Sequence, residues 1–150
     1  MPSPQPKRQK RNPVQWVPSE ERARRDRGGY VRKGSHMLVT TKDMLLKAQE
    51  GHYAVGAFNV ENLEFVMAVI AAAEERHSPV IMQTTPGTVK YASLDYFAAM
   101  CKVAAEAASV PVAIHLDHGD GFDRCIQAMH AGYTSVMIDG SHVAFEDNIA

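Results

Sequence analysis

The chain has 150 residues, enough for one modest domain, and its 45% hydrophobic and 22% charged residues are typical of a globular protein. No apolar run approaches the ~20 residues of a membrane-spanning helix, and the basic N-terminus lacks the apolar segment of a signal peptide, so we expect no membrane partner. The two cysteines, Cys101 and Cys125, are too few for a disulfide framework and favour a reducing, cytoplasmic setting.

The net charge of −1 hides two different kinds of sequence. Residues 1–33 hold ten Lys/Arg against three Asp/Glu, a net of +7, whereas the rest of the chain holds six against fourteen, a net of −8. Residues 1–36 are rich in proline and poor in aliphatic side chains, so we interpret them as a disordered basic leader. The letters GSHM at 34–37 resemble the remnant of a cloning site ahead of a start methionine. A polyanion-binding patch is the alternative interpretation of this leader, although we do not expect a nucleic-acid partner.

Residues 37–150 alternate between helical and extended patterns. The pattern predicts helices over 40–52, 61–77, 94–108, 121–132 and from 144 onwards, strands over 53–60, 78–85, 110–118 and 133–141, and a loop over 86–93. Ser93 is expected to cap the third helix and Gly132 to end the fourth. We expect the first strand to be buried on both faces. The core-filling methionines are expected to be Met67, Met82, Met100 and Met137.

Four apolar strands joined by helices predict a parallel α/β sheet, because parallel neighbours need a crossover connection. No strand is followed by a glycine-rich nucleotide-binding motif, which favours a (β/α)8 TIM barrel over a doubly wound fold. A whole barrel needs roughly 200–250 residues, so 37–150 would form only about the first four βα units, a half barrel. Its first and fourth strands would be open edges that invite pairing with another chain.

Polar side chains gather where the predicted strands end, which is where parallel α/β folds place their sites. The third strand ends in HLDH, in which His115 and Asp117 share one face and His118 lies at the turn. A metal site would explain this cluster, and a core histidine followed by a helix-capping aspartate would explain it equally well. The fourth strand ends in MIDGSH, which adds Asp139 and a further histidine.

The lysines and the remaining histidines of residues 37–150 are not expected to belong to the site. A Schiff-base lysine is an alternative to metal chemistry, but Lys42, Lys47, Lys90 and Lys102 all fall outside the predicted strands. The other histidines, His52, His77 and His130, are expected at helix ends or on helix surfaces.

Four segments carry a resemblance to a known family. In chain order they are YAVGAFNVENLEF, SPVIMQTTPGT, VPVAIHLDHG and AGYTSVMIDGSHVAFEDNI. Together they closely resemble the class II, zinc-dependent fructose-bisphosphate aldolases, a family that includes the tagatose-bisphosphate aldolases. The resemblance covers residues 37–150 and leaves the leader without a counterpart.

The resemblance implies reversible aldol cleavage of a ketose 1,6-bisphosphate to dihydroxyacetone phosphate and glyceraldehyde 3-phosphate. Zn²⁺ would act as a Lewis acid on the ketose carbonyl. Asp117 matches the catalytic acid/base that exchanges a proton with the C4 oxygen, and His118 matches the first zinc ligand. Asp139 matches an acid that holds a second metal in some members, and Asn59 and Thr85 match positions near the substrate.

The resemblance also implies that part of the site lies elsewhere. The family's other two zinc histidines and its phosphate-binding loops belong to the second half of the barrel, which has no counterpart in residues 37–150. We therefore expect a fragment, a homo-oligomer or a chain that pairs with a complementary half barrel. Fructose bisphosphate is the expected substrate, with tagatose bisphosphate as the alternative and a non-catalytic half barrel with a polyanion-binding leader as another.

Overall fold

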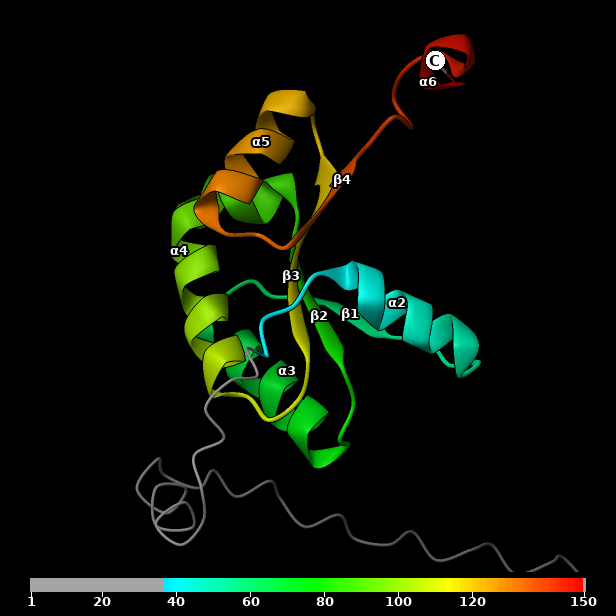
Figure 1. Ribbon diagram of the computed structural model, residues 1–150. Coiled ribbons are helices and arrows are strands. Elements are labelled where there is room, and N and C mark those ends of the chain that lie inside the picture. The colour runs from blue at the N-terminus through cyan, green and yellow to red at the C-terminus, as the bar shows by residue number, and fades with distance from the viewer. Residues whose placement is uncertain (1–36, 150) are drawn as a thin grey trace, which may run out of the picture. The chain divides into compact units, whose positions relative to one another are not determined.

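The computed structural model describes residues 37–149, and the interpretation of residues 1–36 as a leader lies outside this range. The chain alternates regularly between helices and strands (Figure 1). In order, the elements are α2 (Thr41–Glu50), β1 (Gly56–Asn59), α3 (Leu63–Glu75), β2 (Val80–Thr84), α4 (Pro86–Ala107), β3 (Val112–Gly119), α5 (Phe122–Ala131), β4 (Ser135–Ile138) and α6 (Phe145–Ile149).

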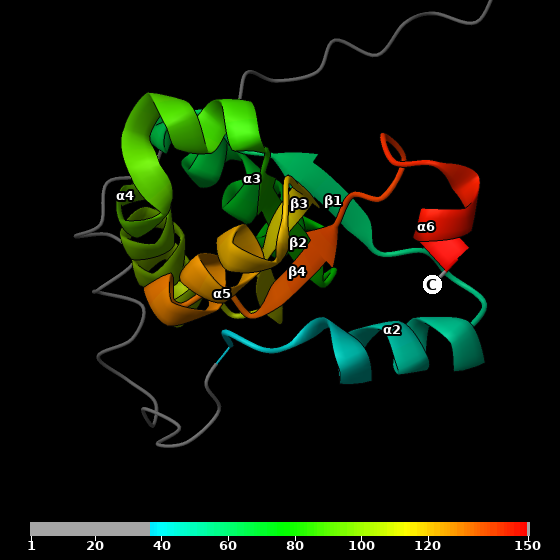
Figure 2. The ribbon, with the colours of Figure 1, turned by 90° about the horizontal axis from the view of Figure 1, so that it is seen from above.

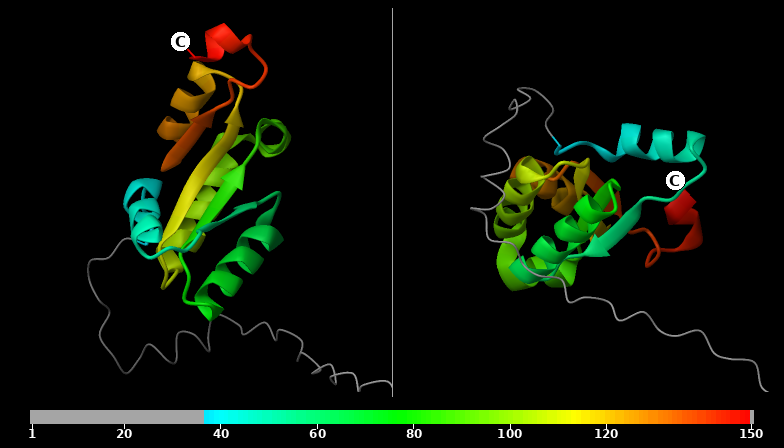
Figure 3. Two further views of the ribbon diagram at one scale, coloured as in Figure 1. Left: turned by 90° about the vertical axis from the view of Figure 1, so that its right-hand side faces the viewer. Right: turned by 90° about the horizontal axis from the view of Figure 1, so that it is seen from below.

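The four strands form one parallel sheet in the order β1-β2-β3-β4. Each strand is joined to its neighbour by a helix, and the left view of Figure 3 shows the strands running side by side with their carboxyl ends at the same edge. This is the arrangement of four successive βα units, so the half-barrel prediction is confirmed.

The two faces of the sheet are covered by different helices, as the view from above in Figure 2 shows. The larger core lies between the sheet and helices α3, α4 and α5, and includes Val66, Phe97 and Leu116, each with no exposed surface. On the other face, Met44 of α2 packs with Ile81 and Ala113. The second face of a barrel sheet is its interior, so α2 fills the interior at the amino ends of the strands.

The segment 86–93, predicted to be a loop, is helical, so that prediction is wrong. Thr85 caps α4 by accepting a hydrogen bond from the Thr88 backbone, and Pro86 stands at the first helical position, which suits its fixed φ. Ser93, with non-helical φ 70° and ψ 160°, divides α4 into two helical segments, so the second segment begins after Ser93 as predicted, although no capping hydrogen bond of its side chain is described. Gly132 does end its helix as predicted, in the left-handed conformation at φ 106°.

Strand β1 is exposed along its whole length, so the prediction of a strand buried on both faces is wrong. No described strand pairs with its outer edge. On the outer side of the sheet, β1 and α3 border a groove of about 760 Å³ lined by apolar side chains that include Phe58, Val69 and Ala72.

Met67 and Met137, predicted to lie in the core, are also exposed, whereas Met82 is fully buried.

The described part of the chain contains neither a membrane-spanning helix nor a disulfide bond. None of its helices has the length and hydropathy needed to cross a membrane. Cys101 and Cys125 are both buried and free of disulfide bonds, as their isolation in the sequence predicts.

Candidate active site at the carboxyl ends of the strands

A β-bulge at the end of β3 brings Asp117 and His118 to the candidate site. The pairing of β3 with β4 is regular at Leu116↔Val136 but resumes at Gly119↔Ile138, so β3 has one residue more than its partner. His118 takes up the extra length with a left-handed backbone at φ 53°, a conformation that is costly for a non-glycine residue. Such strain is concentrated at functional sites, which supports a role for this turn.

Gly119 is required by the close approach of the two strands at this bulge. A Cβ atom at this position would lie 2.6 Å from the backbone oxygen of Met137 and 3.0 Å from the sulfur of Cys125. The glycine of HLDHG is therefore a packing requirement of the bulge, which follows Asp117 and His118 directly.

His118 and Asp139 are joined across the ends of β3 and β4. The Nδ1 atom of His118 lies 2.8 Å from Oδ2 of Asp139, whose Oδ1 accepts a 2.9 Å hydrogen bond from the Ser141 backbone. Hydrogen bonds from Ser141 and His118 hold the pKa of Asp139 well below its ordinary value. The bond to Asp139, followed by the charge of Asp117, raises the pKa of His118. His142, also near Asp139, has its Nε2 atom 3.8 Å from Oδ2.

A second group of polar side chains spans β1, β2 and β3 on the inner face of the sheet. The side-chain amide of Gln83 donates to Oδ1 of Asn59 at 2.7 Å and to Oδ2 of Asp117 at 2.8 Å. The same Asp117 oxygen lies 3.8 Å from Nε2 of His118, which links this group to the His118–Asp139 pair. The structure therefore brings together four of the five residues expected at the site: Asn59, Asp117, His118 and Asp139.

Thr85, the fifth expected residue, has other partners. Its hydroxyl caps α4 and lies 3.2 Å from the hydroxyl of Thr88, which donates at 2.7 Å to Oε2 of Glu61. No hydrogen bond described joins Thr85 to Asn59 or Asp117. Thr85 follows β2 directly, so it lies at the same edge of the sheet but in a separate cluster.

His115 is a half-buried, hydrogen-bonded histidine, which agrees with one part of the alternative interpretation of HLDH. The other part is wrong, because Asp117 does not cap the next helix: α5 follows Gly121 and has no side-chain cap hydrogen bond. Its Nδ1 atom lies 2.7 Å from the hydroxyl of Ser135, which in turn accepts a 3.2 Å hydrogen bond from Thr41 of α2. Burial lowers the pKa of His115, and the charge of Asp117 opposes that effect. Its contact with α2 through Ser135 assigns it to the interior packing below the site.

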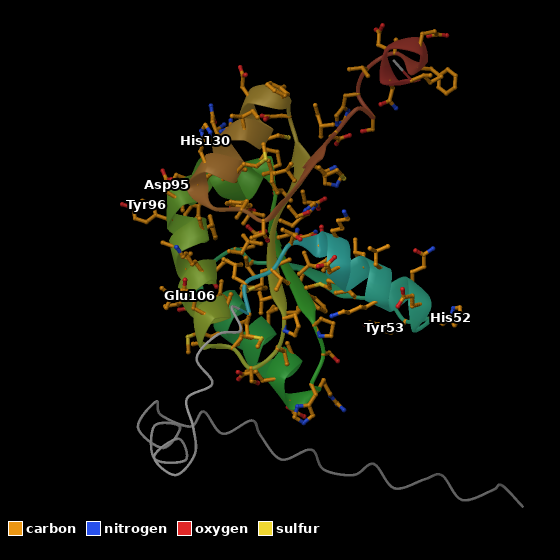
Figure 4. All side chains as sticks on the ribbon, in the orientation of Figure 1. His52, Tyr53, Asp95, Tyr96, Glu106 and His130 are labelled. Atoms are coloured by element: carbon orange, nitrogen blue, oxygen red, sulfur yellow. The ribbon has the colours of Figure 1, made fainter. Side chains whose placement is uncertain are left out.

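The sequence reasoning missed Gln83, the residue that connects the site. The signal was present, because Gln83 is a lone long polar side chain in an otherwise apolar strand. Its register opposite Asn59 and His115 puts it on the inner face. The surface histidines were predicted correctly: His52, His77 and His130 are all exposed, and Figure 4 shows His52 at the end of α2 and His130 on α5, away from the strand ends.

The lysines of residues 37–149 all lie on helices, in exposed positions. Lys42 and Lys47 belong to α2, and Lys90 and Lys102 to α4. None therefore projects from a strand toward Asp117, and the placement of these residues does not favour Schiff-base chemistry in this half of the barrel.

His118 and Asp139 have the arrangement of a zinc ligand and the carboxylate that orients it. A metal-binding histidine commonly donates its other ring N–H to a carboxylate, which is the relation between His118 and Asp139. Catalytic zinc, however, takes three protein ligands, and no group of three His, Cys, Asp or Glu side chains within residues 37–149 is placed to hold a metal ion. His118 fits as one ligand of such a set, and the described residues do not complete it.

The fold and this cluster define a TIM-barrel half with an acid and an imidazole at the strand ends. Residues 39–150 match the family model described as "Fructose-bisphosphate aldolase class-II". The chain therefore belongs to the class II fructose-bisphosphate aldolase family, whose members are lyases.

Curated relatives carry the same name. The chain is 51% identical over 116 residues to a probable fructose-bisphosphate aldolase of Bacillus subtilis, and the match covers 75% of this chain and 41% of that protein. It is 47% identical over 114 residues to a fructose-bisphosphate aldolase of Helicobacter pylori, covering 75% of this chain and 37% of that protein. The chain thus spans about two fifths of the length of the curated relatives it matches.

Solved structures support the fold. The YdjI aldolase of Escherichia coli K12 matches with a TM-score of 0.70 and 40% identity, over 75% of this chain and 43% of that one. A putative fructose-1,6-bisphosphate aldolase from Coccidioides immitis matches with a TM-score of 0.66 and 34% identity, over 72% of this chain and 38% of that one.

Proposed function

We propose that the chain supplies the first half of a site for zinc-dependent, reversible aldol cleavage of a ketose 1,6-bisphosphate. The products would be dihydroxyacetone phosphate and glyceraldehyde 3-phosphate. One observation carries the proposal: the bulge in β3 presents a carboxylate and an imidazole side by side, and Asp139, which directly follows β4, holds the imidazole.

Asp117 is the proposed acid/base. Its side chain is only 18% exposed, and both of its described contacts, with Gln83 at 2.8 Å and with His118 at 3.8 Å, are made by Oδ2, which leaves Oδ1 to exchange a proton with the C4 hydroxyl of the substrate. Asn59 is proposed to bind a substrate oxygen beside it. Thr85, in its separate cluster at the start of α4, is proposed to bind the substrate through that helix N-terminus, which favours an anionic group such as phosphate.

His118 is the proposed zinc ligand, and Asp139 fixes the orientation of its ring. Zn²⁺ bound there would polarise the ketose carbonyl and stabilise the negative charge that develops as the C3–C4 bond breaks. The remaining ligands would come from the part of the barrel that residues 37–149 do not contain. The hydrogen bonds that both Asp139 oxygens make support an orienting role for this residue over a role as a ligand of a second metal.

We further propose that strands outside residues 37–149, from a second copy, a complementary half barrel or the remainder of a longer parent chain, complete the barrel. The free edge of β1 and the apolar groove beside it support this, as do the exposed apolar side chains that follow β4, Val143, Phe145 and Ile149. An open parallel strand edge is a template for pairing. Sedimentation equilibrium of the chain would show self-association, and a strictly monomeric chain would favour a complementary half barrel or a longer parent chain.

Fructose 1,6-bisphosphate is the proposed substrate because the relatives named above are fructose-bisphosphate aldolases. Tagatose 1,6-bisphosphate is the alternative, and a cytoplasmic setting is proposed from the same family. The two sugars differ in one hydroxyl configuration, so parallel assays separate them. Cleavage of fructose bisphosphate in the presence of Zn²⁺, with loss of activity in EDTA, would support the proposal. Equal activity in EDTA would contradict it.

A further inference from the structure

Gln83 is placed at the centre of the inner-face cluster and has no role in the function proposed above. It lies on β2, between Asn59 on β1 and Asp117 on β3. Its side-chain nitrogen makes both of the hydrogen bonds described for it, to Asn59 at 2.7 Å and to Asp117 at 2.8 Å. A glutamine amide has two N–H donors, so both are used.

The direction of these bonds is fixed by the charge of Asp117. An ionised carboxylate accepts hydrogen bonds and cannot donate one, so Gln83 must turn its NH₂ group, and not its carbonyl oxygen, toward Asp117. The same NH₂ group then faces Asn59, so the Asn59 amide must turn its oxygen inward to accept. The reversed amide of Asn59 would place two donors against each other.

One consequence is that Asn59 presents a donor. Because Oδ1 of Asn59 is occupied by Gln83, its NH₂ group is the part of the amide that remains for a ligand. Asn59 is exposed, so that NH₂ group is accessible. A free donor beside a carboxylate suits an oxygen acceptor on the ligand, such as a carbonyl or phosphate oxygen.

We propose that Gln83 is a positioning residue that sets both the amide orientation of Asn59 and the carboxylate rotamer of Asp117. The site would then select a ligand with an oxygen acceptor opposite Asn59 and a hydroxyl opposite Asp117. The assignment of that ligand as a ketose bisphosphate rests on the function proposed above. The positioning itself is a property of residues 37–149 and can be measured without metal or turnover.

The test is side-chain NMR of the whole chain, prepared in EDTA. In the wild-type protein, the Gln83 side-chain amide protons should exchange with solvent at least about tenfold more slowly than those of Gln49, an exposed residue of α2. Scalar couplings should show one χ1 rotamer each for Asn59 and Asp117. The proposal would be overturned if the side-chain amide protons of Gln83 exchanged with solvent as fast as those of Gln49. This measurement needs only the wild-type protein.

Two variants separate positioning from packing. Gln83→Met keeps the length of the side chain without donors, and Gln83→Glu, at a pH where both carboxyl groups are ionised, keeps its shape but offers only acceptors to Asp117. Both should average the χ1 couplings of Asn59 and Asp117 while the backbone amide spectrum of β2 and α4 stays in place. Gln49→Met is the matched control and should leave those couplings unchanged. Single rotamers retained at Asn59 and Asp117 in both Gln83 variants would contradict the proposal.

These outcomes are independent of the aldolase assay. A chain that cleaves no ketose bisphosphate would count against the proposed reaction, yet the rotamers of Asn59 and Asp117 would still decide the role of Gln83. Conversely, suppose that the chain is active but Asn59 and Asp117 keep single χ1 rotamers in both Gln83 variants. That result would refute the positioning role of Gln83 and leave the proposed reaction standing.

Discussion

The imidazole of His118 and the carboxylate of Asp139 form a 2.8 Å hydrogen bond between the ends of two neighbouring parallel strands. The contact is made at the bulge, where His118 has a left-handed backbone with φ 53°. The Asp139 side chain is 12% exposed and the His118 side chain is 58% exposed, so the carboxylate is the more buried partner of the pair.

The first prediction concerns the charge of His118. Asp139→Asn removes the largest cause of its raised pKa, so the pKa of His118 should fall toward its ordinary value of 6.5. Any stability that this pair provides is present below pH 6.5 and is lost as the pH rises through the higher pKa of the folded state. NMR titration of the His118 ring protons in EDTA measures the shift. Asp123→Asn on α5 is the control, and an equal fall in both variants would refute the assignment.

The second prediction concerns the bulge glycine. Gly119→Ala should lower the free energy of unfolding by about 1–3 kcal/mol, because the new methyl group meets a backbone oxygen that cannot move independently of β4. Urea unfolding measures this. In contrast, Gly87→Ala in the first turn of α4 meets only Thr85, at an ordinary contact distance of 3.7 Å, and should not destabilise the fold. Equal stability of the two variants would show that the strands do not approach as described.

The third prediction concerns a buried pair outside the site. The hydroxyls of Thr84 and Tyr133 lie 2.8 Å apart, and both residues are buried. Tyr133→Phe leaves the Thr84 hydroxyl without this partner and should cost about 1–3 kcal/mol of unfolding free energy. The double variant Thr84→Val, Tyr133→Phe should cost less than the sum of the two single changes, since both partners are removed together. Strict additivity in a urea-unfolding cycle would argue against the bond.

The fourth prediction concerns thiol reactivity. Burial raises the pKa of Cys101 to about 12, so this thiol should be almost entirely protonated at pH 8 and inaccessible to reagents. Ellman's reagent should therefore react with Cys101 only after unfolding in guanidinium chloride. Peptide mapping after labelling identifies the modified cysteine, and rapid labelling of Cys101 in the folded protein would contradict its placement.

The fold could be predicted from the sequence where pattern and packing agree. The alternation of apolar strands and helices was enough to predict a parallel sheet, because few other arrangements connect such elements. The burial of β1 was predicted wrongly because its apolar composition fits a complete barrel, and residues 37–149 contain no neighbour for its free edge. The sequence 86–93 predicts a loop because Pro86 and Gly87 are common in loops, but Pro86 follows a capping threonine and therefore begins a helix.

The candidate site was predictable in composition but not in geometry. Asp117 and His118 stand out as polar residues at the end of an apolar strand, and the family motif points to the same positions. The bulge that orients them depends on the pairing of β3 with β4, a long-range feature that has no local signature beyond Gly119. The role of Gln83 likewise depends on partners that lie 24 and 34 residues away.

One measurement tests the central claim most directly. The chain is mixed with a chain that carries the unmatched remainder of the Bacillus subtilis relative, and cleavage of fructose 1,6-bisphosphate is assayed with Zn²⁺ and with EDTA. We expect cleavage that requires Zn²⁺ and falls by at least about a hundredfold with Asp117→Asn, a typical loss for a general acid/base. Cleavage that survives EDTA or Asp117→Asn, or no cleavage from two chains that co-purify, would contradict the account.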